Sequence, residues 1–527
     1  MVNRRAAWRP SPVPAGGEYN HRMNTAEKYK ELTSKAAVIA DLAGAQGLLS
    51  WDMETMMPRG GTEARAHQLG ALASLIHRYY TDPALGDLLG ELSEALADQP
   101  FESTEASVVR AMLRQYRQRT RIPADLVVRR TELSARARDA WKAARRDDDF
   151  AAFVPFLEQQ FALSRELADA LGYEQNPYDA LLDTFEPDTT HAWIHERFEA
   201  VKPALKGLIA RITDARTADP SHDEIASMVH RHVPAETQLA YSRQVAAAVG
   251  YNFDHGRLDL SAHPFTSGSS YLDVRITTRV NEEYFPSCLF AVIHESGHGI
   301  HGQRLGSELY RLPFRYGLGI AESQSRFYEN MLGRSRAFWE HRYPDLQRHV
   351  PQFGEVTLDQ WYRAINAVSP SLIRVEADEV TYGMHIMLRF ELENAVINGE
   401  LEPAELALEW RNRMQDYLGI TPPNDSDGVL QDIHWSMGSI GYFPTYLLGS
   451  MLSAQLWEAV VRAIPTAEEE IRAGSLDNVS GWMAENVQRH GGKFTFAQIA
   501  DIATGTPFSS EPYMSYLERK YSGIYGV

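Results

Sequence analysis

The sequence is almost free of cysteine: Cys288 is the single cysteine among 527 residues. An internal disulfide is therefore impossible, and a zinc site built from several thiolates is excluded. Because this composition suits a reducing compartment, we expect a cytoplasmic protein. Cys288 precedes the apolar residues Leu289 and Phe290, so we expect it to be a buried and unreactive side chain.

Positive charge and long apolar runs are also scarce. Lysine and arginine number 52 against 70 aspartate and glutamate residues, which gives a formal net charge of −18. Such a chain repels nucleic acid and anionic membranes, and its most basic run, 129–146, spreads its charges around a predicted helix. The most apolar late segment, 442–464, is interrupted by Pro444, Glu458 and Arg462. We therefore expect neither nucleic acid nor a membrane as a partner.

The N-terminal residues lack the apolar stretch of a secretory signal. Residues 1–24 are rich in proline, glycine and arginine, which predicts a disordered leader, with ordered structure beginning near Thr25. No repeat and no low-complexity linker divides the remainder. Residues 25–527 are therefore predicted to form a single domain.

Helical periodicity dominates what the sequence does contain. Apolar residues recur at three- and four-residue steps in several segments, among them 26–52, 67–80, 150–171 and 192–212. Strand signals are sparse: the best is 270–280, with "NEEYF" (281–285) as a possible partner strand. The predicted fold is mainly α, a large helical body with a small β-sheet beside the segment described next.

The segment "AVIHESGHGI" (291–300) places three titratable groups in an apolar helical stretch. Each helical residue turns about 100°, so His294 and His298 project from one face, one turn apart. Glu295 is offset to the side, where it can hold a water molecule. This spacing is the H-E-x-x-H signature of zinc peptidases, although two core histidines with a glutamate partner give the same pattern.

A catalytic zinc ion needs a third protein ligand and an open position for water. The next helical segment, 317–335, offers two candidates, Glu322 and Glu329, which lie two turns apart. Glu322 follows His298 by 24 residues (322 − 298), a spacing that suits a site formed between two helices. Position in the sequence therefore favours Glu322 as the third ligand, with Glu329 as the alternative.

Several further motifs complete a pattern that extends from about residue 25 to the C-terminus. They are "HPFTSG" (263–268), "DVRIT" (273–277), "ESQSRFYENMLGRSRAFW" (322–339), "IRVEADEVTY" (373–382), "GVLQDIHW" (428–435), "WDMETMMPRGGTEARAHQ" (51–68) and "NPYDALLDTFEP" (176–187). Together with "HESGH" they resemble the thermostable carboxypeptidase Taq family of metallocarboxypeptidases. The resemblance implies an elongated, almost all-helical fold with a deep active-site groove, related to angiotensin-converting enzyme and neurolysin, and a homodimer.

Carried over to matching positions, the resemblance implies that His294, His298 and Glu322 bind the metal and that Glu295 is the general base. One residue departs from the family pattern: Ala321 stands where the family usually has a histidine before Glu-Ser-Gln. We expect metal binding to survive this change, because Ala321 is not an expected ligand. A lost outer contact of this kind weakens metal affinity or activity by about tenfold or more.

Trimming a peptide from its C-terminus requires a cation that pairs with a free carboxylate, and arginine has the matching planar fork. The resemblance suggests Arg374 for this role. It also implies that four further residues limit how far the substrate extends, namely Arg275, Gln431, Asp432 and His434. A second donor is expected for the oxyanion that develops during hydrolysis, and three residues are candidates: His263, Tyr442 and Tyr446.

The predicted activity is removal of C-terminal residues from peptides with a free C-terminus and broad side-chain tolerance. Zinc is the expected cofactor, although cobalt or another divalent ion suits the same ligands. A zinc oligopeptidase that cuts internally is the first alternative. A metal-stabilised helical interaction protein without turnover is the second, and Glu295 argues against it because such a protein needs no general base.

Overall fold

The computed structural model describes residues 24–312, 314 and 316–527. The predicted leader therefore lies outside the described residues, except for Asn24. Helix α1 begins at Thr25, where ordered structure is predicted to start. Asn24 caps it: its side chain accepts the N–H of Glu27, and the Glu27 carboxylate accepts the N–H of Asn24.

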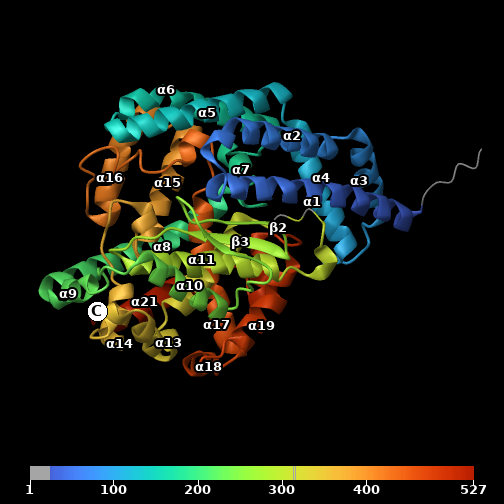
Figure 1. The fold of residues 1–527 in the computed structure, drawn as a ribbon. Helices are drawn as coiled ribbons and strands as arrows, with labels where there is room; N and C mark the ends of the chain where they lie inside the picture. The colour runs from blue at the N-terminus through green and yellow to red at the C-terminus, as the bar shows by residue number, and fades with distance from the viewer. Residues whose placement is uncertain (1–23, 313, 315) are drawn as a thin grey trace, which may run out of the picture.

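An N-terminal layer of four helices has its own apolar core. These helices are α1 (Thr25–Thr55), α2 (Thr62–Tyr80), α3 (Pro83–Ala95) and α4 (Thr104–Arg121), on the blue side of Figure 1. Leu32, Leu89 and Met112 are among its fully buried residues. This cluster is separate from the larger apolar core of the rest of the chain. Whether residues 25–527 act as one domain remains a prediction.

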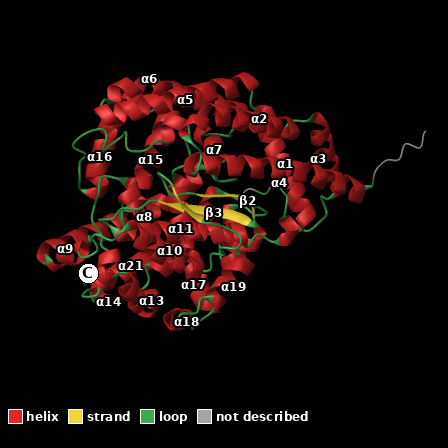
Figure 2. Ribbon diagram, in the orientation of Figure 1, coloured by secondary structure: helices red, strands yellow, loops and turns green. Residues whose placement is uncertain are grey.

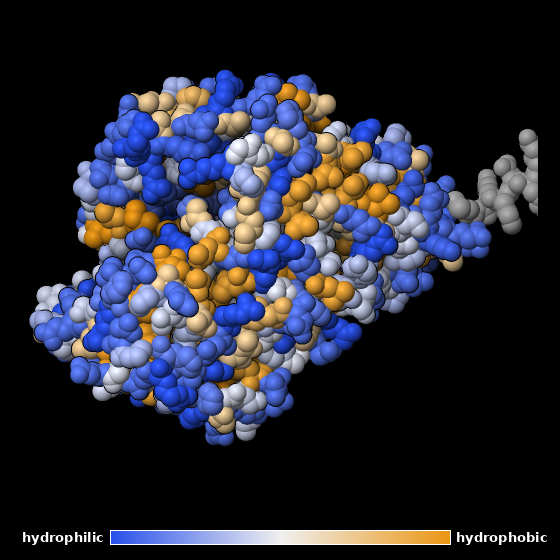
Figure 3. All heavy atoms as spheres, viewed as in Figure 1, coloured by the Kyte–Doolittle hydropathy of each residue, from blue (hydrophilic) through white to orange (hydrophobic). Residues whose placement is uncertain are grey.

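Two long antiparallel helices cover the top of the molecule, and a further set leads down to the sheet (Figure 1). The elements are α5 (Ala124–Asp147), α6 (Phe150–Leu171), α7 (Pro177–Leu182), α8 (His191–Ala218), α9 (Ser221–Ser227) and α10 (Ala235–Ala248). A space-filling view from the same side shows a hollow between α5 and α6 above and the lower half of the molecule (Figure 3).

A small three-stranded sheet lies at the centre (Figure 2). Its strands are β1 (Leu258–Leu260), β2 (Thr266–Ser270) and β3 (Asp273–Thr278), in the order β1-β3-β2. Strand β3 pairs parallel with β1 and antiparallel with β2. The predicted strand in 270–280 is confirmed, but its predicted partner is wrong. Residues 281–284 form a turn, in which the Asn281 side chain accepts the N–H of Glu283, and helix α11 begins at Phe285.

The remaining helices surround the sheet and the C-terminal half. They are α11 (Phe285–Gln303), α12 (Leu318–Arg326), α13 (Arg336–His349), α14 (Leu358–Ile365), α15 (Tyr382–Ile397), α16 (Leu406–Leu418), α17 (Pro444–Ala463), α18 (Ala467–Ala473), α19 (Asp477–Asn486), α20 (Phe496–Thr504) and α21 (Glu511–Tyr525). A π-helical turn, η3 (Phe327–Gly333), continues α12. Single 3₁₀ turns are η1 (Arg59–Gly61), η2 (Ser307–Leu309), η4 (Pro351–Phe353), η5 (Arg374–Glu376), η6 (Pro403–Glu405), η7 (His434–Met437) and η8 (Gln488–His490).

The predicted fold class is confirmed: the described chain is mainly α with one small sheet that packs on α11. The larger apolar core extends from Leu126 to Tyr525 and includes the inner faces of α11, α15 and α17. Cys288 is fully buried in it, as predicted. None of the described helices has the length and apolar character needed to cross a membrane.

Candidate active site

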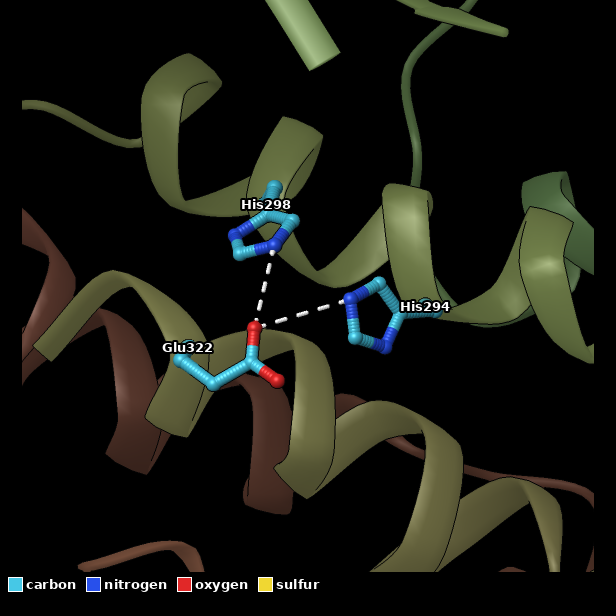
Figure 4. A group of neighbouring side chains, drawn as sticks. All are labelled: His294, His298 and Glu322. Atoms are coloured by element: carbon cyan, nitrogen blue, oxygen red, sulfur yellow. Dashed lines mark ion pairs between the residues drawn. The ribbon is translucent and has the colours of Figure 1, made fainter. Parts of the chain in front are cut away.

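Two helices bring together the three side chains predicted to bind a metal. His294 and His298 project from α11 toward Glu322 of α12 (Figure 4). Glu322 Oε2 lies 3.6 Å from the Nε2 atom of each histidine. Zinc bonds of about 2.0–2.1 Å in tetrahedral geometry separate two donor atoms by about 3.4 Å. The three donor atoms are therefore spaced to share one ion.

A glycine in the H-E-x-x-H segment lets these helices approach each other. A Cβ atom at Gly297 would lie 2.6 Å from the Gln324 carbonyl oxygen and 2.7 Å from Ser325 Cα. Any larger residue at this position would force α12 away from α11. Gly297 thus sets the distance over which Glu322 reaches the two histidines.

The two oxygens of Glu322 have different environments. Oε1 accepts a hydrogen bond from Arg326 Nε at 2.7 Å, whereas Oε2 faces the histidines and accepts the Ser325 hydroxyl at 3.0 Å. Burial would raise the pKa of Glu322, but Arg326 and the two histidines together hold the pKa below its ordinary value. Glu322 is therefore ionised, with one oxygen directed at the metal position.

The alternative ligand, Glu329, lies behind His294. It belongs to the π-helical turn η3, and its Oε2 is 2.9 Å from His294 Nδ1. Arg334 Nη2 donates to its other oxygen at 3.0 Å. Burial opposes ionisation of Glu329, but the His294 hydrogen bond and the neighbouring arginines hold its pKa well below the usual range. This contact orients His294 so that Nε2 points toward Glu322.

His298 is ready to act as a neutral ligand. Burial and then the neighbouring His294 lower its pKa to about 4, and the Glu322 charge only partly opposes this. Glu295, one residue after His294, is 6% exposed, and burial raises its pKa. The Thr266 hydroxyl donates to Glu295 Oε2 at 2.6 Å. Thr266 was not recognised as a functional residue from the sequence, although it follows "HPF" directly in the chain.

A second charged group is built around Asp432, and it contains Arg374. Arg374 binds Asp432 Oδ1 through Nη2 at 2.8 Å, and Arg389 binds Oδ2 through Nε at 2.7 Å. Gln431 accepts the backbone N–H of Arg374 at 2.8 Å. Burial would raise the pKa of Asp432, but Arg389 and then Arg374 lower it far below the usual range. Sequence reasoning missed Arg389, because a buried arginine within a helix has no distinguishing pattern.

His434 and two tyrosines extend this group toward the metal ligands. His434 Nδ1 lies 3.9 Å from Asp432 Oδ1, and its Nε2 lies 3.4 Å from the Tyr446 hydroxyl. The Tyr442 and Tyr446 rings are 5.3 Å apart. Burial and then the Glu322 charge raise the pKa of Tyr442, so the two groups are electrostatically connected.

Tyr382 joins the two groups directly. The Arg374 Nη1 atom donates to its hydroxyl at 3.2 Å, and the Arg326 guanidinium lies 4.4 Å from the centre of its ring. Since Arg326 binds Glu322, one aromatic side chain separates the metal ligands from the Asp432 group. Six of the eight predicted substrate-binding or transition-state residues are thus in one region.

The other two, Arg275 and His263, are placed differently. Arg275 binds both oxygens of Asp273, at 2.7 and 3.1 Å, and stacks 4.3 Å from the Trp51 ring of α1. His263 is exposed just before β2. Within the described part of the chain, neither side chain hydrogen-bonds to His294, His298 or Glu322.

Two imidazoles and a carboxylate from adjacent helices, beside a buried glutamate, define a metallopeptidase-type centre on a mainly α fold. The model of the Carboxypeptidase Taq (M32) metallopeptidase family matches residues 31–521. The chain belongs to this family and is a metallocarboxypeptidase, which confirms the resemblance seen in the sequence.

Relatives of known name support this assignment over nearly the whole chain. Thermostable carboxypeptidase 1 of Thermus thermophilus is 37% identical, over 94% of this chain and 99% of that protein. Carboxypeptidase 1 of Bacillus subtilis is 36% identical, over 94% and 98%. Among solved structures, the M32 carboxypeptidase of Deinococcus radiodurans matches with a TM-score of 0.89 and 36% identity, over 95% and 100% of the two chains. Metallocarboxypeptidase 1 of Trypanosoma cruzi matches with a TM-score of 0.88 and 34% identity, over 94% and 100%.

Proposed function

We propose that this metallocarboxypeptidase binds zinc through His294, His298 and Glu322 and removes C-terminal residues from peptides with broad side-chain tolerance. The observation that supports the site most directly is the convergence of three donor atoms within 4.8 Å of one another. Two imidazole nitrogens and one carboxylate oxygen form a donor set typical of catalytic zinc. Cobalt or another divalent ion is the alternative occupant, and metal analysis of the purified protein distinguishes them.

In this proposal Glu295 is the general base. A bound divalent ion supplies Lewis acidity at the scissile carbonyl and lowers the pKa of a water molecule. Glu295 accepts the proton of the attacking water and delivers it to the departing amine. Its raised pKa suits both steps, because the carboxylate must hold the proton between them. Thr266 keeps the Glu295 carboxylate in one orientation through the hydrogen bond to Oε2.

Tyr442 and Tyr446 are the proposed donors to the developing oxyanion. Burial raises the pKa of both hydroxyls, so both keep the proton that they must donate. His434 Nε2 lies 3.4 Å from the Tyr446 hydroxyl and helps to position it. His263 is the third candidate donor from the sequence. Its side chain is exposed, so the structure supports this role less well for His263 than for the two half-buried tyrosines.

We propose that Arg374 receives the terminal carboxylate of the substrate. Its group contains two arginines and one aspartate, so it retains one positive charge beside the metal ligands. Because Nε and Nη2 donate to Asp432, an incoming carboxylate is expected at Nη1, which also donates to the Tyr382 hydroxyl. Arg275, with Gln431, Asp432 and His434, is proposed to limit substrate length. A homodimer and a cytoplasmic location are further proposals, which rest on the family resemblance and on the low cysteine content.

The proposal is tested with Glu295→Gln. We expect the release of free amino acids to fall by at least about 10²-fold, while the zinc content measured by metal analysis stays at one ion per chain. Glu283→Gln, which changes an exposed glutamate near the start of the same helix, is the control and should keep wild-type activity. Peptide digests followed by mass spectrometry should show single residues leaving from the C-terminus. Chelation or C-terminal amidation should stop this release. Unchanged release by Glu295→Gln would disprove the proposal.

A further inference from the structure

Glu186 is a buried carboxyl group that has no part in the chemistry above. It lies in the turn between α7 and α8 and is 1% exposed. Its partner is the start of the helix that carries Glu322: Oε2 accepts the N–H of Gly319 at 2.6 Å. The preceding residue contributes as well, because the Phe185 carbonyl accepts the N–H of Leu318 at 3.0 Å. Residues 185 and 186 thus satisfy N–H groups of the first turn of α12, which have no acceptor within the helix.

The sequence around the start of α12 leaves room for this carboxyl group and little else. A Cβ atom at Gly317 would lie 1.7 Å from Glu186 Oε1, and one at Gly319 would lie 2.8 Å from Oε2. Glycine on both sides of Leu318 is therefore required for Glu186 to occupy its position. The contact is specific to a side chain of this length in this place, rather than a chance approach of a flexible surface group.

The turn that carries Glu186 is itself held by the N-terminal layer. Arg114 of α4 donates to Asp183 and, at 2.9 Å, to Asp188, while the Asp188 N–H donates to Asp183 Oδ1 at 3.0 Å. The Thr189 hydroxyl donates to the Glu186 carbonyl oxygen at 2.7 Å. The backbone on both sides of Glu186 is therefore fixed, so its carboxyl group is a firm attachment point for α12.

We propose that Glu186 is a positioning residue for the metal site: by holding the start of α12, it fixes Glu322 relative to His294 and His298. Glu322 follows Leu318 by one helical turn, and the two-helix site accepts an ion only if its carboxylate keeps its distance from both Nε2 atoms. Without the Glu186 carboxylate, the Gly319 N–H loses its acceptor, the start of α12 keeps only the Phe185 carbonyl as an acceptor from this turn, and Glu322 is less firmly positioned. This inference rests on the proposed metal site, which the experiment tests separately.

The experiment measures zinc affinity of the full-length protein by competition with a chromogenic chelator. Glu186→Ala should bind zinc about 10- to 100-fold more weakly, the range typical of outer contacts that orient a ligand. Glu186→Gln keeps an oxygen that can accept the Gly319 N–H, so its affinity should stay within about threefold of wild type. Gly319→Ala, which pushes on the same contact from the helix side, should weaken zinc binding like Glu186→Ala.

Glu393→Ala is the matched control. Glu393 is also a fully buried carboxyl group, but it accepts hydrogen bonds from Tyr178, Trp435 and the Gly441 N–H, away from α12. Its loss should lower stability without changing zinc affinity. Equal zinc affinity of folded Glu186→Ala and wild type, or equal weakening by Glu186→Ala and Glu393→Ala, would overturn the inference. So would a loss in Glu186→Gln as large as that in Glu186→Ala. If His294→Ala binds zinc as tightly as wild type, the proposed metal site itself is wrong, which is a different result.

Discussion

Two buried clusters of charged residues lie on either side of Tyr382, and they differ in how their polar atoms are paired. The metal cluster is built around Glu322, with His294, His298, Glu329 and Arg326, and one ligand atom each from Glu322 and the two histidines converge within 4.8 Å of one another. The arginine cluster consists of Arg374, Arg389 and Asp432, whose two oxygens are each bound by a guanidinium. The donor atoms of the metal cluster are spaced to hold a cation, whereas both Asp432 oxygens of the arginine cluster already have a guanidinium partner.

The difference shows what each cluster can contribute. Removal of the Asp432 carboxylate from the arginine cluster should damage the fold, because this group is the shared partner of two arginines inside the core. Removal of a contact from the metal cluster should damage ion binding first, because its polar atoms are arranged around an ion. The experiments below separate the two effects.

The largest effect is expected for Asp432→Ala. It leaves Arg374 and Arg389 buried side by side without their shared carboxylate, and side chains of 6% and 0% exposure cannot turn to solvent. The loss of one partner from a buried pair costs about 3–5 kcal/mol of stability. Chemical denaturation measures this loss, and chelator competition should show zinc affinity close to that of wild type.

Asp416→Ala is the control for this variant. Asp416 pairs with Lys206 at the surface, where the two side chains are 64% and 37% exposed, so its removal should cost less than about 1 kcal/mol. A similar small loss in Asp432→Ala would show that the arginine cluster does not stabilise the core.

The next largest effect is expected for Glu329→Gln, which changes zinc binding by the metal cluster. The amide cannot provide the charged acceptor that His294 Nδ1 and Arg334 now share, so the imidazole is less firmly oriented and less basic. Zinc affinity should fall about 10- to 100-fold, measured by chelator competition. Glu458→Gln, at an exposed surface pair with Arg462, should leave the affinity unchanged. A variant that binds zinc normally would show that Glu329 does not orient His294.

The sequence predicts the metal cluster better than the arginine cluster, and the reason is physical. The spacing of His294 and His298 requires nothing but an α-helix, so both could be located from sequence. Position alone did not exclude Glu329, because residues seven apart share one face of a regular α-helix, and the family resemblance was needed to assign Glu322. The π-helical turn that begins at Phe327 has more residues per turn than an α-helix, so Glu329 is rotated from the position that it would have on a regular α-helix. No pattern in the sequence predicts this turn.

The arginine cluster could be predicted only in part. Arg374 and Asp432 were found through family motifs, and their pairing brings η5 against the segment that precedes η7, 58 residues further along the chain. Arg389 has no such motif. The wrong strand at 281–285 has a local cause, because Asn281 forms a turn and Pro286 fits the first turn of α11. Long-range contacts and local breaks in helix phase therefore account for what the sequence did not predict.

A pH titration distinguishes a carboxylate paired with arginine from one held by neutral donors. Burial raises the pKa of Glu393 to about 7, above its value in the unfolded chain. As the pH rises from 6 to 8 the unfolded state is already ionised, while the folded state resists losing its proton, so the free energy of unfolding falls by about 1.4 kcal/mol. Asp432, with its pKa far below this range, is ionised in both states and contributes no change between pH 6 and 8.

The measurement compares wild type with Glu393→Gln by chemical denaturation at pH 6, 7 and 8. The wild type should lose about 1.4 kcal/mol more than the variant over this interval, because glutamine does not titrate. Glu186, whose pKa burial raises to about 8, is present in both proteins and cancels in the difference. Parallel pH dependence of the two proteins would contradict the raised pKa of Glu393.

The smallest effect is expected where the chain departs from its family. Ala321 is half-buried and directly precedes Glu322 in α12. Ala321→His introduces the histidine that the sequence resemblance leads us to expect there, and an added outer contact should raise zinc affinity or kcat/KM by no more than about tenfold. Ala321→Phe supplies a similar bulk without ring nitrogens, so it should give no gain. Equal gains from histidine and phenylalanine would mean that packing around the metal cluster, and not an added polar contact, is what the alanine lacks.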